Sequence, residues 1–122
     1  MFYNYKFLKR KLYYKDFSIE NLKETDLEKL RIWRNAQRKV LRQNYILSKR
    51  DQKNYFNKYI SKQSKKKFPE VILFAYKYKK ELIGYGGFVY ISWDNNRAEV
   101  SYLLKTEYTL NKDYYKFYTS IY

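Results

Sequence analysis

The sequence predicts an α+β (mixed α/β) fold in which helices cover a mainly antiparallel sheet. Three observations predict it: two segments with helical apolar spacing in the first half of the chain, three consecutive strand-like runs in the second half, and short links between those runs. Short links favour an antiparallel meander, because parallel strands need a long crossover. The expected order is β-α-α-β-β-β-α.

The first predicted strand is followed by a helix. Residues 17–22 alternate apolar and polar side chains, as a short strand does. The Thr-x-x-Glu pattern at residues 25–28 is a capping box, which opens a helix over residues 26–38. No proline or glycine interrupts this helix. Its buried face is predicted to contain Leu27, Leu30 and either Trp33 or Arg34.

A weaker capping box at residues 48–51 opens a second helix over residues 50–61. Residues 40–47 are ambiguous between a loop and extended chain, and the lysine-dense residues 61–67 are expected to be a solvated loop. The apolar stripe of the second helix is predicted to consist of Gln52, Tyr55, Phe56, Tyr59 and Ile60.

Three strands are predicted next, over residues 70–78, 82–92 and 97–104. The first contains a continuous apolar run, typical of a strand buried on both faces. The turns between them lie at Lys79-Lys80 and at residues 94–96, where Trp93 is expected to cap the hairpin. A last helix is expected over residues 111–122, with its tyrosines on one side.

All three glycines of the chain, Gly84, Gly86 and Gly87, lie within one predicted strand. A strand glycine marks a bulge or a close approach of another backbone. We therefore expect an irregular strand here, which shapes a neighbouring cleft.

Composition limits the chemistry available to this chain. At 122 residues it forms one domain, which we divide into a basic, aromatic arm (residues 1–16) and a domain proper (residues 17–122). It has no cysteine and no histidine, which excludes a cysteine nucleophile, thiolate metal sites and the commonest general base. We expect no metal site, and acid–base work must come from Asp, Glu, Tyr, Lys, a terminus or water.

The net charge is +15, which raises the question of nucleic-acid binding. The chain is rich in lysine, asparagine, tyrosine, isoleucine and phenylalanine, which all have AT-rich codons. Genome composition alone can therefore produce this positive charge, and we favour that explanation. There is no signal peptide and no apolar run long enough to span a membrane, so a cytoplasmic location is expected.

Several segments together resemble the first half of the GNAT-superfamily N-acyltransferases. They are Leu30-Arg-Ile-Trp33-Arg34-Asn35, Leu82-Ile-Gly-Tyr-Gly-Gly87 and Arg97-Ala-Glu-Val-Ser-Tyr-Leu-Leu104, in this order and spacing. The resemblance covers roughly residues 17–105. It is nearest to members that acetylate ribosomal-protein N-termini or nucleotide-linked amino sugars. It implies acetyl-CoA as co-substrate and, as acceptor, a small amine, an amino-sugar nucleotide or a protein N-terminus.

The resemblance also implies where acetyl-CoA binds. In that family the pantetheine arm lies against the backbone of the fourth strand, and a glycine-rich loop at the next helix holds the pyrophosphate. Here residues 106–115 contain no glycine. Lys112 is then the candidate phosphate contact, although a solvated lysine is the favoured reading. The pantetheine contacts would be Val100, Ser101, Tyr102, Leu103 and Leu104.

The second half of that family's fold is not seen in this sequence. The domain over residues 17–122 therefore looks truncated after the fourth strand and the following helix. An exposed fourth-strand edge would then offer a pairing surface for an oligomer.

Acetyl transfer to an amine needs a base, a polarised thioester carbonyl and alignment of the reactants. Glu99 is the candidate base; pairing with Arg97 or a lysine is the competing reading. Candidate acceptor contacts are Arg34, Asn35, Tyr85 and Tyr102. For Arg34 and Asn35 the alternative is bracing of the following loop, and for Tyr102 it is packing.

Two further function classes stay open. One is an inactive, truncated remnant of such an enzyme. The other is a basic nucleic-acid-binding module, in which lysines contact phosphates and tyrosines stack on bases. The second is not favoured, because lysine and tyrosine are spread along the whole chain and no nucleic-acid-binding signature appears.

Overall fold

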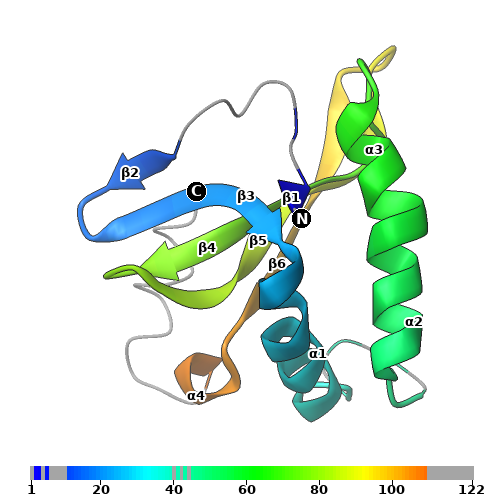
Figure 1. Cartoon of the computed structure of the whole chain (residues 1–122). Helices are drawn as coiled ribbons and strands as arrows, with labels where there is room; N and C mark the ends of the chain where they lie inside the picture. The colour runs from blue at the N-terminus through cyan, green and yellow to red at the C-terminus, as the bar shows by residue number, and fades with distance from the viewer. Residues whose placement is uncertain are drawn as a thin grey trace.

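The computed structural model describes residues 2–3, 5, 11–39, 41, 43 and 45–109, with the side chains of residues 2, 3, 108 and 109 excepted. The described strands form one sheet whose pairings are all antiparallel, in the order β1-β3-β4-β5-β6, with β2 also paired to β3 (Figure 1). The strands are β1 (Phe2–Tyr3), β2 (Leu12–Tyr14), β3 (Phe17–Lys23), β4 (Ile72–Tyr78), β5 (Glu81–Ser92) and β6 (Arg97–Leu104). The predicted fold class, α+β with a mainly antiparallel sheet, is confirmed.

Most of the described helical segments lie between β3 and β4 in the sequence. The segments are the 3₁₀ turn η1 (Glu24–Asp26), α1 (Leu27–Ala36), α2 (Lys49–Asn54), the π-helix η2 (Tyr55–Ile60), α3 (Ser61–Lys65) and, after β6, α4 (Thr106–Thr109). Figure 1 shows α2, η2 and α3 as one continuous rod beside the sheet. No helix among the described residues is long and apolar enough to cross a membrane.

Both faces of the sheet carry buried apolar side chains. On one face, residues of α1 and η2 pack on the central strands; Leu30, Trp33, Phe56, Ile60 and Leu103 belong to this cluster. The opposite face holds a smaller cluster of Phe17, Tyr76, Ile83 and Leu104. The central strand β4 contributes to both, as its continuous apolar run predicts.

The start of α1 differs from the prediction. The chain makes the η1 turn first, so the Asp26 carboxylate, and not the Thr25 hydroxyl, meets a free amide: Oδ2 accepts a hydrogen bond from the Lys23 N–H at 2.9 Å. Glu28, the other half of the predicted box, pairs with Arg31 at 2.6 Å. The predicted capping box at residues 25–28 is therefore wrong, while the buried face of the helix is confirmed.

The second helix is longer than predicted. Ser48 caps it as expected, its hydroxyl accepting from the Asp51 N–H at 3.0 Å. The helical rod then continues to Lys65, so the expected loop over residues 61–67 is wrong for most of its length. Tyr55 and Tyr59, predicted as core, are 44% and 36% exposed. The buried side chains follow one narrower face instead: Gln52, Phe56, Ile60, Gln63 and Ser64.

The glycine-rich part of β5 approaches its neighbours closely, as predicted. A Cβ at Gly84 would overlap the carbonyl oxygen of Leu103, and one at Gly87 would overlap that of Ile72. The register shifts beside Gly84, where Ile83 is the extra residue against β4. A second irregularity separates Val89 from Ser92 against β6. Both neighbouring backbones therefore require glycine in this strand.

Two short strands lie within the predicted arm over residues 1–16. Both β1 and β2 pair with β3, and Tyr5 is buried edge-on against Phe74, with ring centroids 5.7 Å apart. The sequence indicated no strand here, because all three residues of β2 are exposed and carry no burial pattern. The predicted helix over residues 111–122 lies outside the described residues.

Candidate active site

A cavity of about 560 Å³ lies between the helices and the sheet. Its floor comes from β4, β5 and β6, its walls from α1, α2 and η2, and one side from the chain that leads into α2. The lining residues are Leu30, Arg34, Tyr45, Leu47, Asp51, Gln52, Asn54, Tyr55, Phe56, Leu73, Tyr85, Val89 and Ser101. Three sequence-predicted site residues, Arg34, Tyr85 and Ser101, meet here.

Arg34 and Tyr85 form the polar centre of this cavity. Arg34 Nη1 donates to the Tyr85 hydroxyl at 3.1 Å, and Nε donates to Gln43 Oε1 at 3.3 Å. Trp33, one residue earlier in α1, is buried in the core, which fixes the helix face on which Arg34 lies. The guanidinium is thereby held over the floor strand β5, where it supplies a positive charge inside the cavity.

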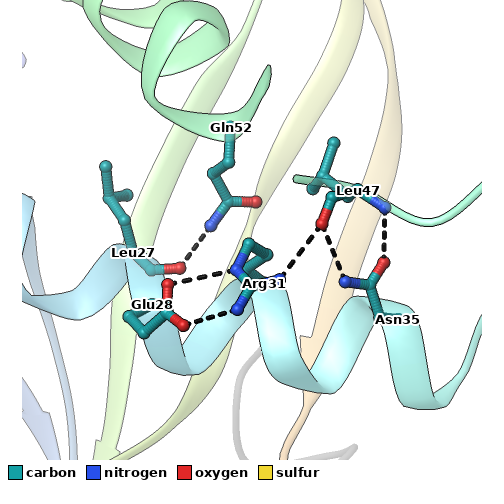
Figure 2. A network of polar contacts seen from close by, with 6 residues as sticks. All are labelled: Leu27, Glu28, Arg31, Asn35, Leu47 and Gln52. Atoms are coloured by element: carbon teal, nitrogen blue, oxygen red, sulfur yellow. Dashed lines mark hydrogen bonds and ion pairs between the residues drawn. The ribbon is translucent and has the colours of Figure 1, made fainter. Parts of the chain in front are cut away.

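Asn35 holds the wall of the cavity. Its Oδ1 accepts from the Leu47 N–H at 2.8 Å, and its Nδ2 donates to the Leu47 carbonyl at 2.9 Å. Arg31 Nη1 donates to the same carbonyl at 3.2 Å (Figure 2). Gln43 Nε2 donates to Asn35 Oδ1 at 3.0 Å and to the Tyr45 carbonyl at 2.6 Å. The bracing of the loop, which we weighed against an acceptor contact for Asn35, is the geometry observed.

The rod of α2 is fixed to α1 by a buried amide. Gln52 is 4% exposed, and its Nε2 donates to the Leu27 carbonyl in the first turn of α1 (Figure 2). A glutamine inside a core is held there only when its amide is hydrogen-bonded. This contact sets the separation of the two helices, and so the width of the cavity between them.

Side chains of β6 alternate between the two faces of the sheet. Leu103 belongs to the core under α1, and Ser101 lines the cavity, so Glu99 projects on that same face, opposite Val89. Glu99 is exposed. Leu104 and Tyr102 pack with the cluster on the other face.

The backbone of β6 alternates as well. The Lys105 N–H donates to the Ile83 carbonyl at 2.6 Å, which fixes which residues bond to β5. Because hydrogen-bonded and non-hydrogen-bonded pairs alternate, the backbone groups of Val100, Tyr102 and Leu104 turn away from β5. The Leu104 carbonyl accepts from Gln37 Nε2 at 2.6 Å. Gln37, which anchors the end of β6 to the end of α1, was not singled out from the sequence and carries no pattern there.

The phenol of Tyr55 has a perturbed acidity. Partial burial raises its pKa to about 12; the neighbouring Tyr85 and Tyr59 add to the rise, and Arg34 opposes it. Tyr55 therefore stays protonated at neutral pH and can donate a hydrogen bond into the cavity. The sequence predicted Tyr55 on the apolar stripe of the second helix. A second tyrosine four residues later, Tyr59, was the one sequence feature that set Tyr55 apart.

Lys112, the candidate phosphate contact, lies outside the described residues. Within the described part of the chain, no group of three or more His, Cys, Asp or Glu residues could hold a metal ion.

An antiparallel sheet, two helices over one face and a polar cavity reaching the outermost described strand are the arrangement of an N-acyltransferase domain. A family model described as an acetyltransferase (GNAT) domain matches residues 19–122, and the chain therefore belongs to the GNAT acetyltransferase family. Domains of this family use acetyl-CoA as the acetyl donor. Searches of curated proteins and of solved structures found no match.

Proposed function

We propose that this chain transfers an acetyl group from acetyl-CoA to a primary amine held in the cavity between α1, α2 and the sheet. The acceptor we favour is an amino sugar, free or nucleotide-linked; a protein N-terminus is the alternative. The observation that carries the proposal is the meeting of Arg34, Tyr85 and the β6 residue Ser101 in that one cavity.

The lining of the cavity supports a sugar acceptor. Phenols of Tyr45, Tyr55 and Tyr85 and the amide of Asn54 surround the space, and Asp51 adds a carboxylate. Hydroxyl and amide groups match the hydroxyls of a sugar ring, and the carboxylate suits the charge of an ammonium group.

Acetyl-CoA would bind along the side of β6 that faces away from β5. The family resemblance implies a pantetheine arm over residues 100–104. In support of this, Val100, 51% exposed, turns its backbone groups to that side. When bound there, acetyl-CoA supplies an activated thioester carbonyl. The anchoring of Leu104 by Gln37 would hold the strand in position for it.

Glu99 would act as the base. Transfer forms a C–N bond to the amine and breaks the C–S bond, so the ammonium of the acceptor must first lose a proton. Glu99 projects on the cavity face of β6 between Arg97 and Ser101, beside the cavity that Ser101 lines. Because its carboxylate is exposed, it would pass the proton on to water.

The proposal is tested by incubating the full chain with acetyl-CoA and a panel of amines. The panel contains amino hexoses, nucleotide-linked amino hexoses and short peptides with free N-termini. We expect release of the CoA thiol, and an acetylated product by mass, with at least one amino sugar. Transfer to peptides alone would replace the favoured acceptor with the alternative, and no transfer by a folded chain would refute the proposed activity.

A further inference from the structure

A second cavity of about 630 Å³ adjoins the first. The two share Tyr55 and Val89 in their linings, so they lie side by side on the sheet beside η2, and we call them together the groove. We call the second part the distal cavity and define it by Tyr59, Glu70, Tyr90 and Arg97 together with the shared Tyr55. Nothing in the acetyl-transfer proposal uses these side chains except Tyr55.

Irregular backbone from two elements converges on the distal cavity. Tyr55 and Tyr59 belong to η2, a π-helix, and such segments are rare and frequent at functional sites. Tyr90 sits at the β5–β6 irregularity with φ of 50°, a left-handed conformation that non-glycine residues rarely adopt. The residue is 76% exposed. Backbone strain of this kind clusters at active sites and ligand-binding sites.

The end wall of the distal cavity is fixed before any ligand binds. The Glu70 N–H donates to Oε1 of the buried Gln63 at 2.7 Å, and the Glu70 carbonyl accepts from the Ile91 N–H at 3.1 Å. Trp93 Nε1 donates to the Pro69 carbonyl at 2.8 Å. Helix α3, β5 and the hairpin turn therefore all hold this short segment, and such preorganisation favours binding.

The chemistry of the distal cavity points to an uncharged, hydroxyl-rich ring. Partly exposed tyrosine rings offer flat apolar faces, against which the C–H faces of a sugar ring pack. Glu70 and Arg97 offer an acceptor and a fork of donors at the same cavity, both suited to hydroxyl groups. Burial raises the pKa of Tyr59, and the nearby Glu70 carboxylate and Tyr90 add to the rise. Because Glu70 and Arg97 carry opposite charges, the distal cavity offers no net charge that would select the diphosphate of a nucleotide carrier.

We propose that the distal cavity is a second sugar subsite, which binds a neutral or hydroxyl-rich ring joined to the amino sugar whose amine occupies the first cavity. The natural acceptor is then an amino-sugar-containing disaccharide or longer glycoside. That the amine occupies the first cavity rests on the proposed function. That a sugar ring binds beside Tyr59 and Tyr90 does not depend on the proposed function.

The test is equilibrium binding without acetyl-CoA, so that it does not depend on catalysis. The probes are D-glucosamine and its β(1→4)-linked dimer with the neutral sugar D-glucose, titrated against the full chain by calorimetry. The wild-type chain is expected to bind the dimer at least tenfold more tightly than the monomer. Tyr59→Ala and Tyr90→Gly are expected to reduce that advantage to about twofold and leave the affinity for the monomer unchanged. Glycine is used at position 90 because it accepts the left-handed backbone.

Tyr13→Ala is the matched control, since Tyr13 is 72% exposed on β2, outside the groove. It is expected to leave both affinities unchanged. A wild-type chain that binds the dimer no better than the monomer overturns the inference, as does an advantage that survives both groove variants. Tighter binding of a short peptide, lost in Tyr90→Gly, also overturns it and assigns the groove to a polypeptide. Absence of acetyl transfer with an intact dimer advantage would refute only the proposed function.

Discussion

Single side chains connect parts of the chain that are far apart in the sequence. Arg34 and Tyr85 are 51 positions apart and share a hydrogen bond in the cavity, and Gln37 reaches Leu104 across 67 positions. Removing one partner of such a contact leaves a polar group unsatisfied. Single substitutions at these contacts are therefore expected to lower stability as well as to change binding in the cavity.

Glu99→Gln tests the assignment of the base. The amide cannot accept the proton from the acceptor ammonium, so kcat is expected to fall about 10²- to 10⁴-fold. The affinity for acetyl-CoA should be unchanged, because the backbone of β6 is intact. Initial rates of CoA release measure the first quantity and calorimetry the second. Glu81→Gln, another exposed carboxylate, which pairs with Lys105, is the control. Wild-type turnover in the Glu99 variant would remove this residue from the mechanism.

Gly84→Ala tests the close approach of β5 and β6. Its Cβ would overlap the backbone carbonyl of Leu103, which cannot rotate away as a side chain can. The strands must separate, and we expect a loss of about 1–3 kcal/mol in the free energy of unfolding. Urea denaturation measures it. Glu81→Ala, at the exposed start of the same strand, should cost less than about 1 kcal/mol; an equal cost in the two variants would contradict this account.

At the scale of elements, α1 and the loop into α2 behave as one unit. Asn35 binds both backbone groups of Leu47, and Arg31 adds a third contact to the same residue (Figure 2). The wall of the cavity therefore depends on its contacts with α1.

Asn35→Ala is expected to release this wall. The loss of its hydrogen bonds should lower stability by about 1–3 kcal/mol and speed hydrogen exchange at the Leu47 amide. Exchange followed by NMR measures the local effect. Asn95→Ala, which removes a single exposed bond to Ser92, is the control and should leave Leu47 unaffected. Unchanged protection of Leu47 in the Asn35 variant would show that the loop is held by other contacts.

The elements differ in how far the sequence predicts them. The bounds of β6 and the close approaches of β5 follow from alternation and from the placement of the three glycines. The extension into α3 was missed because its buried residues, Gln63 and Ser64, are polar and give no hydrophobic period. Gln63 is buried because its amide bonds to Glu70 across the end of the sheet, a contact that depends on the tertiary fold.

The sequence singles out only some of the residues of the candidate site. Arg34 and Tyr85 were singled out because they lie in segments that resemble a known family, and they meet in the cavity. Tyr55 and Tyr59 were assigned to the core, because the spacing of a regular helix puts them on its apolar face. In the fold that face is narrower, and both rings border the groove.

For the whole molecule, the balance of charge is uneven: 27 lysines and arginines accompany 12 acidic residues. Among the described acidic residues, Glu20 is buried and lies beside two lysines. Its carboxylate is buried and pairs with Lys77 and, at 3.1 Å, with Lys11. Burial raises the pKa of Glu20, but the two ion pairs outweigh that effect and hold it below its ordinary value of 4.5.

A depressed pKa means that the ionised form stabilises the fold. This contribution is present above pH 4.5 and is lost as the pH falls through the lower pKa of the folded state. Lys77→Met removes the buried partner and should cost about 3–5 kcal/mol at pH 7. The cost should be smaller at pH 4, where the Glu20 carboxyl, left with Lys11 as its ion-pair partner, more readily takes up a proton.

Urea denaturation at the two pH values measures both quantities. Lys11→Met is the matched control, because the Lys11 side chain is 56% exposed and solvent screens its charge, so its removal should cost less. Equal costs for the two lysine variants, or a cost for Lys77→Met that does not change with pH, would contradict the role given to Glu20.

The central claim is that this chain folds into an acetyltransferase domain that binds acetyl-CoA. Thermal unfolding of the full chain, with and without excess acetyl-CoA, tests it most directly. A ligand at 100 times its Kd stabilises the native state by about 2.7 kcal/mol, so we predict one cooperative transition that rises by several degrees. A sharp transition that excess acetyl-CoA leaves unmoved would contradict the claim.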